Sequence, residues 1–214
     1  MRSLGQNVSL ALGVLAVLSV FLPIGALERA LVEPMARHLL MVAVAAPLLT
    51  LGGALDPIRR REWMRTLESP TTAWTIFVAV FAFWLWPAVF RWAAGNEFIL
   101  TFEYLSILAA ALVFWDVALS GDRPLRLCYG ARALFLMTAA VATDLPAVLM
   151  ALAPTANYTT PGEYSVHWGL STLQYQQFAG LLMWMPANVV FFGFAAFLFT
   201  RWLSSEEHGL QGMT

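Results

Sequence analysis

Six long apolar stretches occupy most of this chain, and nearly every charged residue lies between them rather than within them. Hydrophobic residues make up 60% of the 214 residues and charged residues 12%, whereas charged residues make up roughly 25% of a soluble globular domain. A helix needs about 20 apolar residues to cross the hydrocarbon core of a bilayer. The pattern therefore predicts an all-α, polytopic transmembrane helical bundle with spans near 7–26, 33–52, 72–92, 98–120, 129–153 and 176–203.

Length, net charge and cysteine content further limit the kind of protein that this sequence can encode. The chain is long enough for one compact bundle, so we expect a single transmembrane domain over residues 1–214. The formal net charge is −1 at pH 7, and a surface for nucleic acid would require a basic excess. Cys128 is the one cysteine. This excludes an intramolecular disulfide and any Cys-x-x-Cys redox or metal motif.

The arginines of the loops predict the orientation of the bundle. The loop 53–71 carries four arginines and the loop 121–128 carries two, whereas the loop 154–175 carries none. Basic residues concentrate in the cytoplasmic loops of membrane proteins. We therefore expect both termini and the two arginine-rich loops in the cytoplasm. The loop 154–175 then lies outside, where its aromatic, proline and glycine residues favour an ordered cap at the interface.

Local signals predict two helix ends. Gly52 and Gly53 are expected to close the second span, because glycine is the preferred residue just past the end of a helix. Trp84, Trp86 and Trp92 stand near the outer end of the third span. Their position is typical of the aromatic belt at a membrane interface.

Charged residues inside the predicted spans are the main candidates for function, because a charge at membrane depth is costly and normally faces the bundle interior. They are Glu33, Arg37, His38, Glu103, Asp116 and Asp144. Arg37 and Glu103 each lie about one turn from the outer end of their spans, so we predict an ion pair between them. Such a pair would act as a clamp between helices or as a metal or proton site. The third alternative is that both side chains extend to the interface.

The two aspartates are interpreted mainly as packing residues. Asp144 precedes Pro146 by two positions, and a proline bends a helix and frees the carbonyl about four residues back. A carboxylate beside such a break becomes protonated or pairs with another helix. Asp116 lies nearer the cytoplasmic side, and we expect it to meet an arginine of the loop 121–128.

A metal site is the second interpretation of His38. Met35 and His38 stand three residues apart on one helix face, and thioether and imidazole groups suit Cu(I). Met183 and Met185 are two residues apart, so they do not share a face. A lone histidine within a span is more often a core residue, and methionines in a membrane core more often serve packing. The chain has no hydrolase, kinase or dinucleotide motif, so the sequence does not support enzymatic activity.

Four ordered segments of the chain resemble the caa3-type cytochrome c oxidase assembly factor family, which comprises CtaG-like membrane proteins. The first contains Arg-His-Leu-Leu followed by Ala-Pro-Leu-Leu and glycine, and the second reads Trp-Leu-Trp-Pro. The third begins Phe-Glu-Tyr-Leu and ends Phe-Trp, and the fourth contains Gln-Gln and Met-Trp-Met-Pro. In order, they are Met35–Gly52, Trp84–Pro87, Phe102–Trp115 and Trp168–Pro186.

The chain departs from the family pattern at its histidines and at one aspartate. Where the family tends to have histidine, this chain has Pro34, Leu85, Leu100 and Tyr104. Tyr175 replaces the aspartate that precedes the two glutamines, which are Gln176 and Gln177 here. Of the family's candidate metal-ligand histidines, His38 alone persists. The resemblance thus implies a retained scaffold, with both glutamines as structural polar residues, and a reduced ability to bind copper.

The resemblance implies a non-catalytic assembly factor or accessory subunit of a bacterial haem–copper terminal (cytochrome c) oxidase. We expect it in the inner (cytoplasmic) membrane, in contact with the oxidase core subunits and lipid, without nucleic acid and without a resident cofactor. The missing histidines favour a permanently bound subunit. Two alternatives remain, a copper-handling membrane protein that uses His38 and methionines, and a small transporter with a polar site at Arg37 and Glu103. The absence of inverted repeats in the sequence counts against transport.

Overall fold

The computed structural model describes residues 3–22, 32–59, 61–119, 127–158 and 169–211. All regular elements in these ranges are helices, which confirms the predicted all-α class for this part of the chain. In chain order they are α1 (Leu4–Val20), α2 (Val32–Leu39), the π-helix η1 (Leu40–Ala45), α3 (Ala46–Leu51), α4 (Glu62–Leu67), α5 (Pro70–Trp84), α6 (Pro87–Ala94), α7 (Glu97–Leu119), α8 (Tyr129–Leu152) and α9 (Thr172–Gln211).

Several of these helices are long and apolar enough to cross a membrane. Four meet this condition: Pro34–Leu51, which joins α2, η1 and α3, then α7, α8 and the Thr172–Ser205 part of α9. The pair α5–α6 makes a fifth if it forms one span, and α1 is shorter, with 17 residues. The protein is therefore a multi-pass membrane protein with four to five candidate spans. Each predicted span coincides with an apolar helix, but six complete spans are not established.

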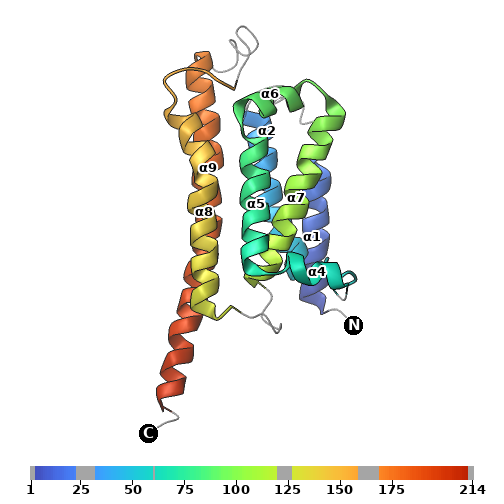
Figure 1. Cartoon of the computed structure of the whole chain (residues 1–214), viewed down its shortest axis with the longest axis vertical. Coiled ribbons are helices and arrows are strands. Elements are labelled where there is room, and N and C mark those ends of the chain that lie inside the picture. Colours follow the sequence, from blue (N-terminus) through green and yellow to red (C-terminus); the bar gives the residue numbers. More distant parts are fainter. Residues whose placement is uncertain (1–2, 23–31, 60, 120–126, 159–168, 212–214) are drawn as a thin grey trace.

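The span predicted near 72–92 is not one straight helix, because α5 and α6 meet at an angle of 69°. The break lies at Pro87, which has no N–H to continue the helical hydrogen bonds and disfavours helical geometry in the residue before it. Trp86 accordingly adopts an extended conformation, with φ −67° and ψ 128°. The short helix α6 therefore lies across the end of the bundle (Figure 1).

The same break divides the three tryptophans of the expected aromatic belt. Trp86 and Trp92 are 63% and 58% exposed, as a position at the interface requires. Trp84 is 3% exposed, and its Nε1 donates a hydrogen bond to Ser106 Oγ at 2.8 Å. Trp84 thus belongs to the core and links α5 to α7, because it precedes the turn that exposes its neighbours.

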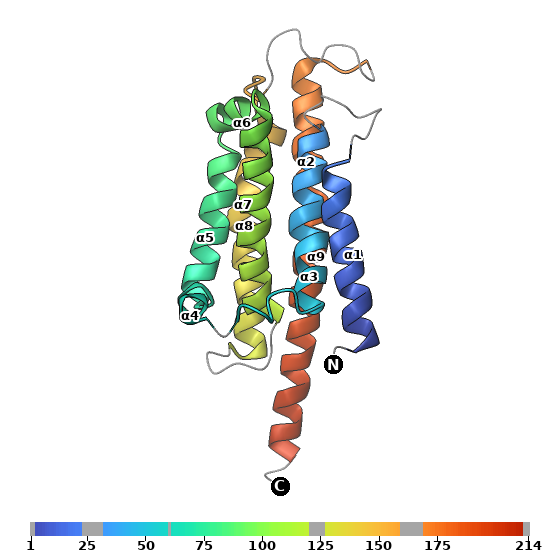
Figure 2. The same cartoon turned by 90° about the vertical axis from the view of Figure 1, so that its right-hand side faces the viewer.

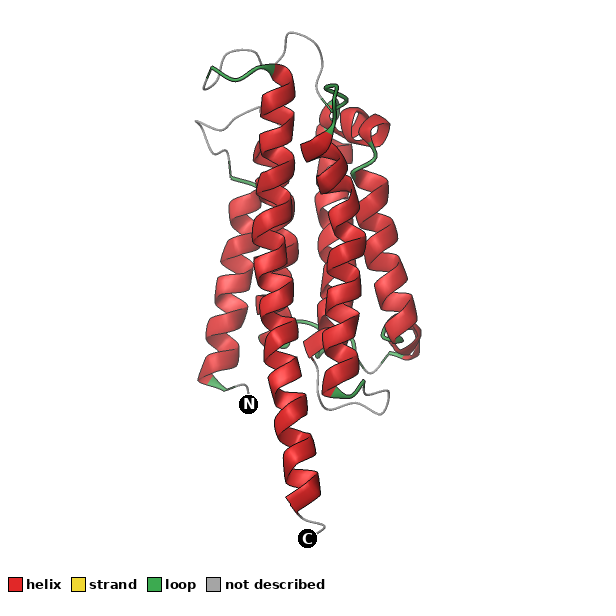
Figure 3. Cartoon of the chain, turned by 90° about the vertical axis from the view of Figure 1, so that its left-hand side faces the viewer, coloured by secondary structure: helices red, strands yellow, loops and turns green. Residues whose placement is uncertain are grey.

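The helices form a bundle in which distant parts of the chain lie side by side. An antiparallel hairpin of α8 and α9 stands beside α5 (Figure 1), and the α2–α3 segment lies between α1 and α9 (Figure 2). The first residues of α1 and the last residues of α9 lie at the same end of the bundle, and α9 extends well past its neighbours there (Figure 3). This end also carries the turn after α3 and the start of α8.

An aromatic cluster forms the centre of the core. Phe114 of α7 stacks on Phe77 of α5 at 4.5 Å between ring centroids and on Phe135 of α8 at 4.7 Å. Phe191 of α9 lies 5.1 Å from Trp115. Aromatic pairs of this geometry contribute about 0.5–1.5 kcal/mol each beyond their buried area. The cluster therefore joins α5, α7, α8 and α9 at one level.

The π-helix η1 is tied to the same cluster. A π-turn shifts backbone carbonyls out of the usual α-helical pairing, and such turns are frequent at functional sites. Trp115 Nε1 donates to the carbonyl of Val42 in η1 at 2.7 Å, and this contact is buried. The indole thereby fixes α7 against the irregular part of the second helical segment, which begins two residues after His38.

Two glycines have clear steric roles. Gly53 has φ +73°, its N–H donates to the Thr50 carbonyl at 3.0 Å, and the N–H of Ala54 donates to the Leu49 carbonyl at 2.9 Å. These bonds close α3 as predicted, because glycine adopts positive φ without steric cost. Gly180 in α9 faces α8 so closely that an added Cβ would lie 2.7 Å from the backbone nitrogen of Ala151. The α8–α9 hairpin thus depends on this missing side chain, as small residues permit close helix contact in membranes.

Candidate functional site: a buried polar centre

His38 and Glu103 form the centre of the polar interior. His38 is the second-last residue of α2, and Glu103 lies in the second turn of α7. Their Nε2 and Oε1 atoms are 2.9 Å apart, and the side chains are 0% and 1% exposed. Neither atom has an aligned hydrogen-bond partner, so the contact is a close electrostatic approach rather than a linear hydrogen bond. The ring of Tyr104 packs edge-on against the imidazole at 5.5 Å between centroids.

The predicted Arg37–Glu103 pair is replaced by this His38–Glu103 pair. Successive residues of an α-helix point about 100° apart, so only one of two neighbours can face α7 directly. His38 takes that position. The Arg37 guanidinium lies 5.9 Å from the centre of the Tyr104 ring, and its Nη2 donates to the carbonyl of Leu22 after α1 at 3.4 Å.

Asp144 pairs with an amide on the neighbouring helix of the hairpin. Asn188 Nδ2 lies 3.0 Å from each of the two Asp144 carboxylate oxygens and donates also to the Trp184 carbonyl at 3.1 Å. Asp144 precedes Pro146 in α8, and Asn188 follows Pro186 in α9. The hydrogen bonds between Asp144 and Asn188 therefore join α8 and α9 close to their two prolines. This contact agrees with the expectation that Asp144 pairs with another helix.

Asp116 contacts Arg59, an arginine that was not predicted as its partner, and the predicted contact with an arginine of the loop 121–128 stays a prediction. Its side chain is 0% exposed, and Arg59 donates to it and to Asp56 with separate guanidinium nitrogens. Arg59 follows α3, whereas the predicted partner was an arginine of the loop 121–128. Residues 120–126 lie outside the described residues, but Arg132 is described, and its Nε donates to the Ala118 carbonyl at 2.6 Å. The contact between Arg59 and Asp116 therefore places the turn after α3 against the last turn of α7.

Gln176 and Gln177 attach the start of α9 to the chain that follows α8. Gln176 is 0% exposed, and its Oε1 accepts from the N–H groups of Asn157 and Tyr158 at 2.7 and 3.0 Å. Its Nε2 donates to the carbonyls of Met150 and Thr155. Gln177 Nε2 donates to the Ala153 carbonyl at 3.2 Å. Both glutamines thus satisfy backbone groups at the end of α8, which would otherwise lack partners.

Tyr158 closes the described part of the outer loop. It is 8% exposed, its hydroxyl donates to the Leu85 carbonyl at 2.8 Å, and its ring lies edge-on to Phe90 at 5.7 Å. Burial raises the pKa of the Tyr158 hydroxyl to about 12. The start of the loop is therefore an ordered cap over the α5–α6 break. The remaining residues predicted to form the cap are Pro161, Gly162, Tyr164, His167 and Trp168, and they lie outside the described residues, as does the side chain of Glu33.

The structure does not assemble an obvious metal centre from these residues. Within the described ranges, no three or more His, Cys, Asp and Glu side chains are grouped closely enough to hold a metal ion. Met35 is 0% exposed and packs in the aromatic core, and Met183 lines a small cavity beside His38. Copper binding by Met35 and His38 therefore stays a prediction. The pairing of His38 with Glu103 and the role of Asn188 were missed, although Asn188 follows a proline within a span, which was a usable signal.

The fold and this centre define a multi-pass helical membrane protein whose buried polar side chains mainly contact one another across helices. The sequence model of the cytochrome c oxidase caa3 assembly factor family matches residues 3–205. The chain therefore belongs to this family, and membership implies a role in cytochrome c oxidase assembly. Comparison with curated proteins and with solved structures gives no match. The resemblance seen in four segments is confirmed and extends over nearly the whole chain.

Proposed function

We propose that this protein is a non-catalytic membrane partner of the core subunits of a bacterial haem–copper oxidase, and that it stays bound as an accessory subunit. The observation that carries the proposal is the family match over residues 3–205, since the family is described by cytochrome c oxidase assembly. The chain lacks most of the histidines of the family pattern. A scaffold that keeps its packing residues and loses metal-binding ones suits a structural partner better than a metal carrier.

The use of the buried polar groups supports this role. His38 contacts Glu103, Asp144 contacts Asn188 and Asp116 contacts Arg59. Each contact joins two segments that are distant in sequence, so the polar groups hold the bundle together. None of these three contacts includes a serine, threonine or cysteine side chain that could act as a nucleophile.

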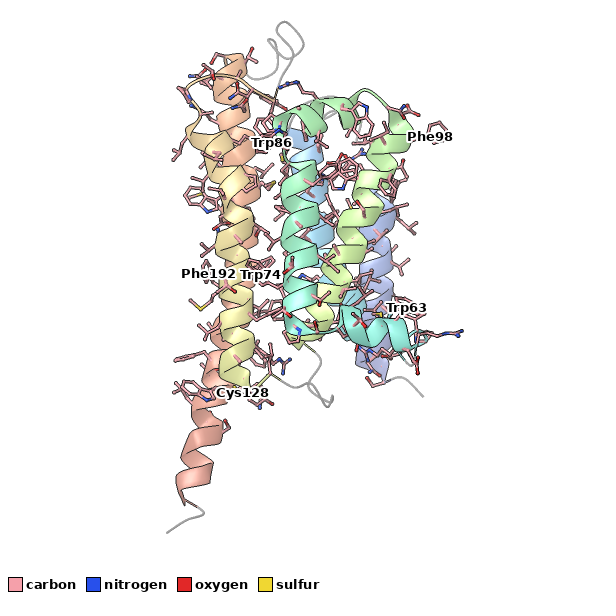
Figure 4. The ribbon with its side chains drawn as sticks, in the orientation of Figure 1. Trp63, Trp74, Trp86, Phe98, Cys128 and Phe192 are labelled. Atoms are coloured by element: carbon pink, nitrogen blue, oxygen red, sulfur yellow. The ribbon has the colours of Figure 1, made fainter. Side chains whose placement is uncertain are left out.

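The orientation follows from the ends of the bundle. We propose six membrane segments with both termini in the cytoplasm of the bacterial inner membrane. Arg59 and Arg132 are both near the end that holds the first residues of α1, and arginine marks the cytoplasmic side. Trp86 and Phe98 lie at one end of the bundle and Trp63 at the other (Figure 4). Exposed aromatic residues at both ends are typical of the two membrane interfaces.

The lipid-facing side of α8 offers a surface for a partner helix. Four apolar side chains, each four or seven residues from the next, are 61% to 65% exposed: Leu134, Val141, Leu145 and Leu149. Their spacing places them on one helix face. An accessory subunit needs such a face for contact with oxidase helices, and the rest of its apolar surface contacts lipid.

Affinity purification through a tag on the C-terminal tail tests the proposal. After gentle solubilisation, we expect the oxidase core subunits in a one-to-one ratio with the bait and with haem bound. A bait that carries Gly180→Ala is the matched control, because it perturbs the α8–α9 hairpin without altering the tag, and it should recover less oxidase. Recovery of immature core subunits at a low ratio would support a transient assembly factor instead. Recovery of the bait alone would contradict partnership with the oxidase.

A further inference from the structure

A small cavity lies inside the bundle next to the buried polar centre. Its volume is about 20 Å³, and residues of α2, η1, α5, α8 and α9 line it. A cavity of this size holds about one water-sized particle. His38, Thr143 and Asp144 are its polar lining residues, and the rest of the lining is apolar. The cavity is thus a site for one small polar particle at membrane depth.

The charge of Asp144 is the first indication of what the cavity binds. Its carboxylate accepts two hydrogen bonds from the neutral amide of Asn188. No cationic side chain forms an ion pair with Asp144 in the part of the chain that the structure describes. A carboxylate at membrane depth is normally paired, because an uncompensated charge there is costly. A cation bound in the cavity would therefore balance the charge of the ionised Asp144 carboxylate.

Two buried polar atoms near Asp144 have no hydrogen-bond partner among the described residues. Asn188 Nδ2 faces three oxygen atoms, so Asn188 Oδ1 points away from them. This Oδ1 atom is buried and has no hydrogen-bond partner among the described residues. His38 is equally buried, and its Nδ1 likewise has no partner in that part of the structure. A neutral imidazole presents one acceptor nitrogen. An acceptor-rich site favours a cation or a hydrogen-bond donor over an anion.

Two helices that line the cavity, α8 and α9, are each interrupted by a proline. Pro146 in α8 and Pro186 in α9 have no N–H, so the carbonyls of Ala142 and Leu182 lose their usual helical donors. Ala142 adjoins Thr143, and Leu182 adjoins Met183, both of which line the cavity. Membrane proteins commonly coordinate small cations with the freed carbonyls of interrupted helices.

We infer that this cavity binds one small monovalent cation of the size of Na⁺ or K⁺, with the Asp144 carboxylate as its counter-charge. One carboxylate among neutral oxygen and nitrogen atoms matches a single positive charge. Divalent ions require more anionic or soft ligands, and no suitable group of three His, Cys, Asp or Glu side chains exists in the described ranges. Asn188 is a positioning residue that holds the carboxylate in place. The site does not depend on the role in oxidase assembly.

Thermal unfolding of the purified full-length chain in nanodiscs tests the inference. NaCl or KCl is titrated against choline chloride at constant ionic strength, and unfolding is followed by tryptophan fluorescence. We expect Tm to rise with the logarithm of the Na⁺ or K⁺ concentration, as for any ligand that binds only the folded state. The Asp144→Asn variant should lose this dependence. The Asp116→Asn variant removes a buried carboxylate that contacts Arg59, and it should keep the dependence.

A direct measurement covers the case in which Asp144→Asn fails to fold. Equilibrium dialysis of the unaltered chain with ²²Na⁺ should detect one bound ion per chain, displaced by excess Na⁺ and not by choline. Absence of bound ²²Na⁺ together with equal Tm values in all three salts would overturn the inference. A salt dependence that persists in Asp144→Asn would overturn it as well, as would a Tm that responds to pH but not to Na⁺ or K⁺.

Discussion

The imidazole of His38 lies against the carboxylate of Glu103, with 2.9 Å between Nε2 and Oε1, and both side chains are almost fully withdrawn from the surface. The contact joins α2 to α7 two residues before the π-helix η1 begins at Leu40. We expect this pair to have a structural or functional role, because each ionisable group alone is costly at this depth in a membrane. Its contribution to stability can be measured directly.

We expect His38→Gln and Glu103→Gln each to lower the free energy of unfolding by about 0.5–2 kcal/mol, because each leaves a buried polar partner unsatisfied. In a double-mutant cycle the two changes should be non-additive, with a coupling of at least about 0.5 kcal/mol. The measurement is reversible unfolding in detergent. Arg37→Gln combined with Glu103→Gln is the matched control and should be additive. Additive effects of the His38 and Glu103 variants would show that the contact contributes nothing to the free energy of unfolding.

Gly180→Ala should destabilise the α8–α9 hairpin by about 1–3 kcal/mol, because overpacked contacts force the backbone to shift. The added Cβ would lie 2.7 Å from Ala151 N and 2.8 Å from the Ala147 carbonyl oxygen. Gly193→Ala is the matched control on the same helix, since nothing lies within 4 Å of its added Cβ. It should be neutral or stabilising by up to about 1 kcal/mol, as alanine favours helices over glycine. Equal Tm values for both variants would disprove close packing at Gly180.

Tyr158 should ionise at unusually high pH. Burial raises its pKa to about 12, whereas an unfolded tyrosine has a pKa of about 10. The protonated form is favoured in the folded state, so its stabilising contribution is complete below about pH 10 and is lost as the pH rises through about 12. A titration of tyrosinate absorbance should show one group near pH 12 that disappears in Tyr158→Phe. That variant also loses the bond to Leu85, at a cost of about 1 kcal/mol. An unchanged titration curve in Tyr158→Phe would contradict the assignment.

Cys128 reports the orientation of the chain. It is exposed at the start of α8, at the end of the bundle that we assign to the cytoplasm (Figure 4). A membrane-impermeant maleimide should label it in inverted vesicles and not in intact spheroplasts. The control is Gly95→Cys in a Cys128→Ser background, where an added Cβ meets nothing closer than 3.6 Å. This residue follows α6 at the opposite end and should show the reverse pattern. Labelling of Cys128 from the outside would invert the proposed topology.

Most helices and the family were predictable from the sequence, because both depend on local signals. Apolar length alone located α7 and α8 to within one residue of the predicted spans, and glycine chemistry located the end of α3. The break between α5 and α6 was missed although Pro87 was visible. An apolar run hides a helix break, because the residues on both sides are equally suited to a membrane.

The sequence by itself determined that the chain is helical, that it is embedded in a membrane and that its few buried charges matter. The tertiary structure decided which charges meet. Arg37 and His38 are neighbours with similar depth, and the rotation of α2 alone determines that His38 faces Glu103. Arg59 reaches Asp116 because the turn after α3 folds back against α7, and Asn188 reaches Asp144 because Gly180 lets α8 and α9 approach closely. Depth in the membrane follows from local composition, whereas a partner depends on the rotation and packing of whole helices.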